Sequence, residues 1–272
     1  MERNKIIECL FLEEENIQLS TPIYRYLSLE SFLFLLEFKR IPFSKIKNWP
    51  DSFEGSHFDF MSRQHKENHA KHNVISDFYA SCWTLQEEPR VLYSTEREHK
   101  NAVEELKQHG SAAMWQSYCQ NGGVRIKTTI GKFVDICQEY PSGYTIYHGP
   151  VYYAAANSFS KTIKAPDQIY TLLHKRVSFR YESEYRFILI TDSEKNHSIE
   201  TVPTGDLFDF IDEILVSPAT ETGEWIARTI YHMGLDITID YPKRTDINSK
   251  DGKRFCRISQ LFKRISEDVG YH

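Results

Sequence analysis

The most informative segment of this chain is His174-Lys175-Arg176-Val177-Ser178-Phe179-Arg180-Tyr181-Glu182-Ser183-Glu184-Tyr185-Arg186-Phe187-Ile188-Leu189-Ile190. Its alternating pattern predicts a β-strand from Phe179 to Ile190, because successive strand side chains point to opposite faces. In that strand Glu182, Glu184 and Arg186 share one face. Arg186 could hold one carboxylate ionised through a bidentate pair and leave the other to act on a ligand. The structural alternative is a solvated strand face with an ion pair.

The overall composition is that of a soluble globular protein. The chain has 272 residues, of which 40% are hydrophobic and 26% are charged. This length allows one or two domains and a sizeable core. The formal net charge of −5 argues against a general nucleic-acid-binding surface. A local basic groove stays compatible with that charge.

The cysteines and the N-terminus indicate a cytoplasmic protein. The five cysteines are odd in number and contain no C-x-x-C pair, which argues against a disulfide framework and a cysteine zinc site. Reduced thiols fit a cytoplasm. The N-terminal residues are charged, and no stretch approaches the roughly 18 apolar residues that span a membrane. We therefore expect a cytoplasmic location and no membrane partner.

The predicted elements mix strands and helices without strict alternation. Strands are predicted at 24–26, 78–83, 124–126, 150–153 and 237–239, and helices at 29–36, 112–118, 130–139, 221–233 and from about 167. This mixture favours the α+β class, with mixed, mainly antiparallel sheets and flanking helices. We expect a single domain over residues 1–272, with a core at 20–220 and a C-terminal helix and strand extension at 221–272.

Two common kinds of site receive little support. His65, His69 and His72 share one helical face at a spacing that can bind metal. Their lysine and asparagine neighbours favour a solvated face, so we expect no metal. The chain also lacks a G-x-S-x-G elbow, a Walker loop and a G-x-G-x-x-G motif. The commonest sequence signatures of nucleotide-binding sites are therefore absent, which leaves nucleotide binding by another fold open.

Two aromatic segments have both a functional and a structural interpretation. Residues 48–54, with the sequence Asn-Trp-Pro-Asp-Ser-Phe-Glu, combine an indole with two acids, either at a site or as simple turn chemistry. Trp115 and Tyr118 lie one helical turn apart. Such a pair can stack on a planar ring or belong to the core.

Several motifs along the chain belong together. In order they are Tyr24-Arg25-Tyr26, Phe43-Ser44, residues 48–54, Ser81-Cys82-Trp83, Met114-Trp115-x-x-Tyr118, Gly122-Gly123-Val124, Val151-Tyr152-Tyr153, Lys175 and Phe179-x-Tyr181-Glu182-x-Glu184-Tyr185-Arg186. In that order the chain resembles the bacterial domain-of-unknown-function 2971 family over roughly residues 24 to 220. The Y-E-x-E-Y-R motif is the most specific part. Phe179 stands where the family usually has tryptophan, and Trp49-Pro50-Asp51 replaces a tighter Asn-Asp-Pro.

A weaker likeness concerns the order of an aromatic strand, a helix and a late strand that bears E-x-E. This order is similar to that of ADP-ribosyltransferases, and the resemblance implies an ADP-ribosyltransferase-like core with NAD as the substrate. Tyr24 or Tyr26 would then hold the nicotinamide ribose. Trp115 or Tyr118 would stack on nicotinamide.

The same resemblance implies roles for the charged residues of the late strand. Glu184, with Glu182, would orient a ribose hydroxyl and stabilise an oxocarbenium-like transition state. Lys175 and Arg186 would pair with the pyrophosphate or hold the glutamates ionised. Glycosidic cleavage needs a carboxylate near the anomeric carbon, and an ionised glutamate on a strand can supply it.

Three functional interpretations follow. The leading one is an NAD-dependent ADP-ribosyltransferase or NAD glycohydrolase, for example a toxin or phage-defence protein that modifies a protein or nucleic acid. The second is a non-catalytic binding module of a multi-component defence or regulatory system that binds a partner protein. The third is a nucleic-acid-acting effector that places Lys175, Arg176, Arg180 and Arg186 on phosphates. An open cleft lined by Glu184 and the aromatic residues would favour the enzyme. Tight packing of those side chains would favour the binding module.

Overall fold

The computed structural model describes residues 5–8, 17–49, 78–85, 95–140, 144–155, 172–191, 197–217, 223–232, 238–241 and 256–257. The chain divides into two compact units. Unit 1 comprises Met1–Ile23, Arg40–Leu85 and Thr129–Thr204, and unit 2 comprises Tyr24–Lys39, Gln86–Thr128 and Gly205–His272. The proposed division into a core at 20–220 and an extension at 221–272 stays a prediction.

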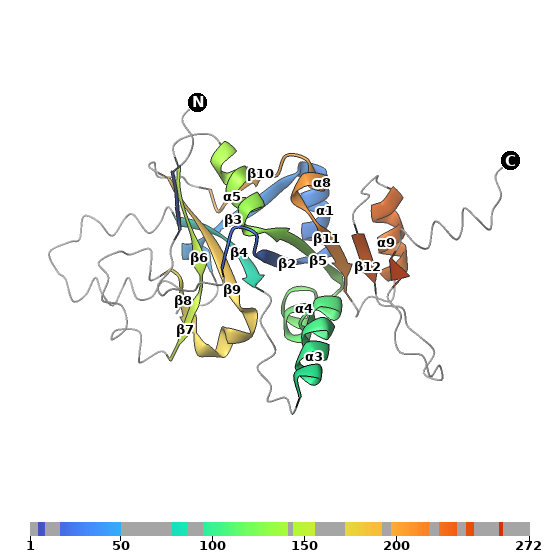
Figure 1. The fold of residues 1–272 in the computed structure, drawn as a ribbon. Helices are drawn as coiled ribbons and strands as arrows, with labels where there is room; N and C mark the ends of the chain where they lie inside the picture. Colours follow the sequence, from blue (N-terminus) through green and yellow to red (C-terminus); the bar gives the residue numbers. More distant parts are fainter. Residues whose placement is uncertain are drawn as a thin grey trace, which may run out of the picture. The chain divides into compact units, whose positions relative to one another are not determined.

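Unit 1 is built on a mainly antiparallel sheet (Figure 1). Its strands, in spatial order, are β10 (Ile199–Pro203), β3 (Arg40–Lys45), β4 (Phe78–Leu85), β9 (Glu184–Thr191), β6 (Tyr144–Pro150) and β1 (Lys5–Glu8). Only the β1–β6 pairing among these is parallel. A separate parallel pair joins β7 (Tyr152–Ala154) to β8 (His174–Arg176). The 3-10 helices η1 (Ile46–Asn48) and η3 (Val177–Glu182) complete the described part of this unit, together with α5 (Ile130–Glu139).

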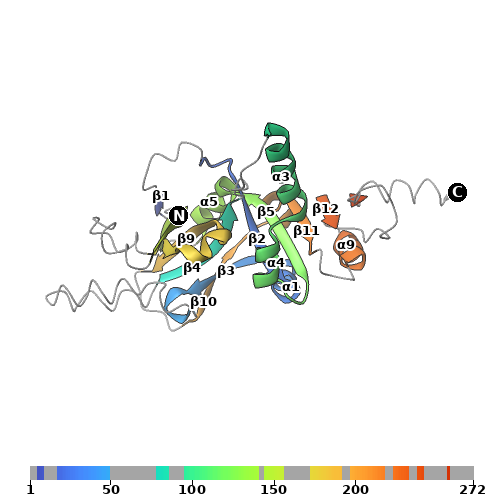
Figure 2. The same ribbon diagram turned by 90° about the horizontal axis from the view of Figure 1, so that it is seen from below.

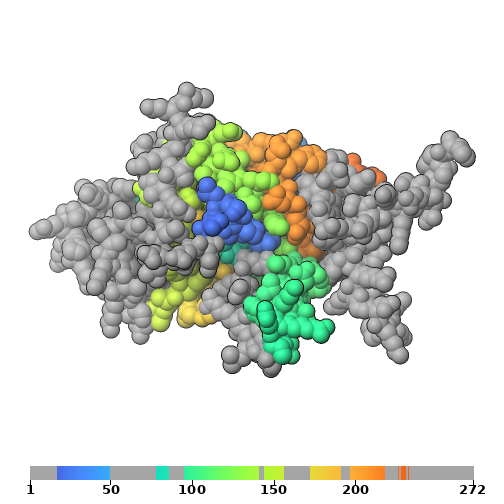
Figure 3. All heavy atoms as spheres, in the orientation of Figure 1, coloured from blue at the N-terminus to red at the C-terminus, as the bar shows by residue number. Residues whose placement is uncertain are grey.

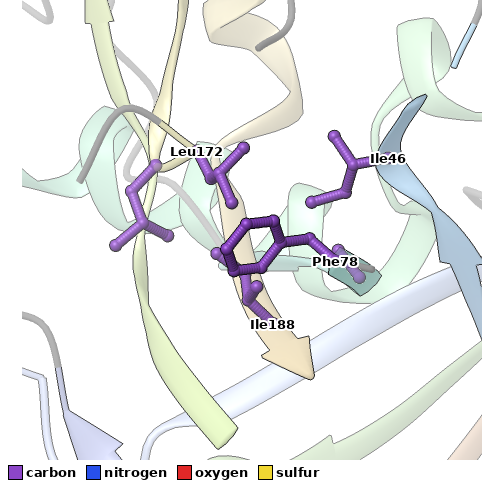
Figure 4. Packing of buried hydrophobic residues seen from close by; sticks show 6 residues of the cluster. Ile46, Phe78, Leu172 and Ile188 are labelled. Carbon is purple, nitrogen blue, oxygen red and sulfur yellow. The ribbon is translucent and has the colours of Figure 1, made fainter. Parts of the chain in front are cut away.

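The two faces of β9 pack against different apolar groups. On one face Phe187 stacks on Phe133 of α5, with ring centroids 3.9 Å apart. On the other face Ile188 packs with Ile46, Phe78 and Leu172, and Figure 4 shows these side chains gathered around the ring of Phe78. Burial on both faces places β9 in the core of unit 1.

Unit 2 combines a second set of strands with helices. The strand order is β2 (Pro22–Ser28), β5 (Gly123–Thr129), β11 (Glu213–Val216), β12 (Thr238–Tyr241) and β13 (Cys256–Arg257). The helices are α1 (Leu29–Phe38), α3 (Glu96–His109), α4 (Ala112–Tyr118), α8 (Leu207–Phe210) and α9 (Gly223–His232). Helices α1, α3 and α4 begin with Ser or Thr caps whose side chains accept a backbone N–H of the first turn.

The C-terminal end of helix α3, which is drawn in Figure 2, is bound by a side chain of β5. None of its side chains is buried. Arg125 of β5 donates hydrogen bonds to the carbonyls of Leu106 and Lys107 and pairs with Glu213 at 3.0 Å. A cation at the C-terminus of a helix satisfies its last carbonyls and favours its dipole.

The α+β class with mainly antiparallel pairing is confirmed. The predicted helices that begin at residues 29, 112 and 130 are present. In the described part of the chain, no helix is long and apolar enough to cross a membrane.

The prediction of a continuous strand from Phe179 to Ile190 is wrong. Val177–Glu182 form η3, and the strand begins only at Glu184. Between them Ser183 has φ 44° and ψ 53°, in the left-handed region that an extended strand does not visit. The predicted helix from about residue 167 falls mostly outside the described residues. Its last part, Leu172 and Leu173, forms a turn before β8.

Candidate functional site

Four charged side chains of unit 1 meet in one buried cluster. Lys175 Nζ donates to Glu182 Oε2 at 2.5 Å and to Glu184 Oε2 at 3.3 Å. Arg186 binds Glu184 in bidentate fashion, with Nε to Oε1 at 2.7 Å and Nη2 to Oε2 at 2.9 Å. The exposed fractions are 8% for Lys175, 4% for each glutamate and 1% for Arg186. We call these four residues the ion-pair cluster.

Three different elements deliver these side chains. Glu184 and Arg186 lie two residues apart on β9, so they share a face as the alternation predicts. Lys175 comes from β8. Glu182 is the last residue of η3, and the left-handed turn at Ser183 separates it from the strand. The predicted shared strand face is therefore correct for Glu184 and Arg186 and wrong for Glu182, which joins the cluster through Lys175.

The surroundings of the cluster satisfy its remaining hydrogen-bonding groups. Arg186 Nη1 donates to the carbonyl of Leu172 at 2.6 Å, and its guanidinium lies 4.8 Å from the centre of the Trp49 ring. The backbone N–H of Glu184 donates to the Tyr153 hydroxyl at 2.8 Å. The Cys82 thiol donates to the Glu184 carboxylate. Buried charges persist only when they are paired and hydrogen-bonded in this way.

Glu184 is ionised in this environment. Burial alone raises the pKa of its carboxyl, because a charge is costly away from water. The charge and hydrogen bonds of Arg186, the charge of Lys175 and the Cys82 hydrogen bond outweigh that effect. Together they lower the pKa of Glu184 from 4.5 to about 2.

The lowered pKa of Glu184 predicts an acid-sensitive stability. Because the folded pKa lies below the unfolded one, ionised Glu184 contributes stability above about pH 4.5, and this is lost as pH falls toward 2. Urea unfolding of wild type and Glu184→Gln between pH 2 and 6 should show the difference in unfolding free energy shrinking by about 3 kcal/mol. The exposed Glu139→Gln variant is the control. A difference that does not change with pH would contradict the ion pair.

The predicted nicotinamide-contacting residues lie in unit 2. The rings of Tyr26 and Trp115 meet edge to face, 4.7 Å apart at 80°. The Tyr26 hydroxyl accepts the Ser111 N–H at 2.8 Å, and Trp115 Nε1 donates to the His109 carbonyl at 2.7 Å. Both rings are buried in a cluster with Met114, Cys119 and Leu215.

The other two predicted aromatic residues differ in exposure. Tyr24 is buried, and its ring lies 4.7 Å from the guanidinium of Arg125. Burial raises the pKa of Tyr24 to about 12, against the opposing charge of Arg125. Tyr118 is 46% exposed. Among these four aromatic residues, only Tyr118 offers a ring that a planar ligand can reach without displacing the core.

Other sequence motifs have mixed outcomes. The ring of Trp49, whose segment has both a site and a turn interpretation, lies 4.8 Å from the guanidinium of Arg186, while residues 50–54 lie outside the described residues. His65, His69 and His72 also lie outside them. Within the described ranges no group of three His, Cys, Asp or Glu side chains is placed to hold a metal ion. Cys82 and Tyr153 are part of the motifs of the family resemblance, but the sequence predicted no role for them at the site. The tertiary structure places both side chains within hydrogen-bond distance of Glu184.

The ion-pair cluster and most of helix α4 fall within one segment that is similar to a known family. Residues 114–187 match the family described as Protein of unknown function (DUF2971). The match confirms the resemblance to the DUF2971 family for this segment, which contains Trp115, Tyr118 and the whole ion-pair cluster. Comparison with curated proteins and with solved structures found no match.

Proposed function

We propose that this chain is a non-catalytic binding module, which would serve a multi-component defence or regulatory system. The observation that supports this best is the state of the Glu184 carboxylate. Arg186 holds both of its oxygens, and Lys175 contacts Oε2 as well. A carboxylate that stabilises a developing cation must face the reacting atom. Glu184 faces two cations of its own chain, which offset its charge.

The aromatic residues give independent support. The buried Tyr26 and Trp115 rings pack against each other, and their polar atoms have partners within the chain. A ligand ring could stack on them only after this packing was opened. Core packing of the aromatics and pairing of the acids are what the binding-module interpretation expects.

In such a module the ion-pair cluster has a structural task. Replacing a buried ion pair with apolar residues is often neutral or stabilising, so the pair itself does not explain the stability of the fold. Its geometry specifies one arrangement of β8, η3 and β9, because Lys175 must reach both Glu182 and Glu184. Rigid scaffolds of this kind position the surface segments that bind partners.

The second candidate is a cytoplasmic NAD-dependent ADP-ribosyltransferase or NAD glycohydrolase, acting as a toxin or in phage defence. Two observations favour it. Glu184 is ionised, and Glu182 lies beside it on the same lysine. For catalysis Lys175 and Arg186 would have to move onto the NAD pyrophosphate and release the carboxylates.

NAD turnover separates the two candidates. Purified wild type, Glu184→Gln and the exposed control Glu139→Gln are incubated with labelled NAD, with and without cell extract. We expect all three proteins to release nicotinamide and transfer label at the rate of the protein-free sample. An enzyme would lose on the order of 10²-fold or more of its rate in Glu184→Gln alone. That result, with all variants folded, would replace the binding-module proposal with the enzyme.

A further inference from the structure

Helix α1 carries large apolar side chains on its exposed side as well as on its buried side. Leu33 is 52% exposed, Phe34 37% and Phe38 57%. The rings of Phe34 and Phe38 lie against each other, with their centroids 4.8 Å apart. Single exposed apolar residues are common on soluble proteins, whereas a contiguous group that includes two aromatic rings is typical of a binding surface.

Two glutamates lie among these apolar residues. Glu30 and Glu37 are both exposed, and they project from the same side of the helix two turns apart. In the part of the chain that the structure describes, neither carboxylate forms an ion pair or a side-chain hydrogen bond. Helix α1 contains no lysine or arginine that could pair with them. We call Glu30, Leu33, Phe34, Glu37 and Phe38 the α1 face.

The position of Glu37 is unfavourable within α1 itself. The C-terminal end of a helix has a partial negative charge, which repels an acid in the last turn and favours a cation. Glu37 lies in the last turn of α1, which has no basic residue. Helix α3, which Figure 3 shows in bluish green at the molecular surface, instead has Lys107 and His109 in its last turn. A cation from another molecule would relieve the repulsion at Glu37.

The backbone of α1 is already fixed in the free protein. The Ser28 hydroxyl accepts the Ser31 N–H at the first turn, and the Lys39 N–H donates to the Leu35 carbonyl at 2.9 Å at the last. Phe32 and Leu35 are buried on the opposite side of the helix. A helix held in this way loses little conformational entropy when another molecule binds to it.

The two carboxylates select the kind of molecule that covers the α1 face. In a symmetric pair of two copies, Glu30 of one copy would lie beside Glu30 or Glu37 of the other, so like charges would meet. An anionic membrane surface would also meet both carboxylates. A helix with cations among its apolar residues would meet unlike charges, and such complementarity gives an interface its specificity.

We propose that the α1 face docks an amphipathic helix of a partner protein. Lysine or arginine residues of that helix pair with Glu30 and Glu37, and its apolar residues cover Leu33, Phe34 and Phe38. Packed helices have their axes about 8 to 10 Å apart, which long cationic side chains can bridge. This inference rests on the binding-module function and names its surface and the chemistry of its partner.

The test uses the full chain and a pooled library of fluorescent peptides of about 18 residues, long enough to form a helix. Each peptide has an apolar stripe at helical spacing, with two lysine or arginine residues two turns apart beside it. A matched library carries glutamate in place of these cations. We expect fluorescence anisotropy to show salt-sensitive binding of the basic library alone.

Variants of exposed residues locate the binding on α1. Glu37→Gln should weaken it about two- to fivefold, the effect of losing one exposed ion pair. Phe38→Ser should weaken it about tenfold, because an aromatic anchor is lost. The double variant Glu30→Lys, Glu37→Lys should prefer the acidic library, and the exposed control Glu139→Gln should bind like wild type. Thermal unfolding checks that each variant is folded.

Four results would overturn the inference. Two of them are absence of binding to the basic library and equal binding by wild type and Phe38→Ser. The others are self-association that Phe38→Ser removes, measured by sedimentation, and binding to vesicles of phosphatidylserine and phosphatidylcholine in preference to the peptides. None of them involves NAD turnover, so failure of the α1 face is distinguishable from failure of the binding-module function. Only Glu184-dependent NAD cleavage refutes the latter.

Discussion

Replacing Arg186 with methionine is expected to lower the free energy of unfolding by about 3 to 5 kcal/mol. The guanidinium donates to both oxygens of Glu184 and to the Leu172 carbonyl. Methionine keeps much of the apolar stem and leaves Glu184 as a poorly compensated buried charge. Urea unfolding at neutral pH measures the loss, and the exposed Arg180→Met variant should stay within about 0.5 kcal/mol of wild type.

A double variant tests whether this loss comes from the charge. Adding Glu184→Gln to Arg186→Met neutralises the stranded carboxylate, so part of the lost free energy should return. The double-mutant cycle should give a coupling of about 1 to 3 kcal/mol between the two positions. Additive single effects would show that the two residues do not act as a pair.

Replacing Lys175 with methionine should have an effect of similar size, about 3 to 5 kcal/mol. Lys175 stands between Glu182 and Glu184, and without it the carboxylates repel each other in a buried site. The change should also loosen η3, because the ion pair between Lys175 and Glu182 holds the end of this segment. Urea unfolding measures the global loss, and Lys100→Met in α3 is the exposed control.

Hydrogen exchange distinguishes Lys175→Met from Arg186→Met. The Ser183 N–H, which donates to the Arg180 carbonyl at 3.2 Å, should exchange faster in Lys175→Met relative to the β9 core. In Arg186→Met the pair between Lys175 and Glu182 is still present, so protection of Ser183 should fall only with global stability. Equal protection of Ser183 in Lys175→Met and wild type would contradict the anchoring role of the cluster.

Much of the local structure could be read from residues close together in the chain. Ser28 directly precedes the predicted helix at 29–36 and is a residue type that favours the N-cap position, and its hydroxyl accepts the Ser31 N–H. The apolar spacing of residues 130–139 likewise predicted α5, which buries Phe133 and Cys137. Glu184 and Arg186 were placed on one face by a spacing of two residues. Each of these inferences needs only short-range geometry, because caps, helix faces and strand alternation act within a few residues.

The interruption of the predicted strand between Glu182 and Glu184 could not be predicted from such short-range geometry. The alternation of residues 179–190 continues through Ser183 without a glycine or proline to mark a turn. Ser183 adopts its left-handed conformation because distant groups hold the chain there. The Leu85 N–H binds its carbonyl, and Lys175 draws Glu182 inward. Such bonds depend on how β4 and β8 lie beside β9.

The roles of the aromatic residues show the same limit. A helical spacing of three residues makes Trp115 and Tyr118 equally available for a ligand. Packing against Tyr26 buries Trp115, while Tyr118 stays 46% exposed. The sequence determined the class of fold, the helices with their caps, and the pairing of Glu184 with Arg186 on one strand face. Only the tertiary structure decided that this pair is buried and neutralised by Lys175, because burial and charge compensation arise from side chains distant in sequence.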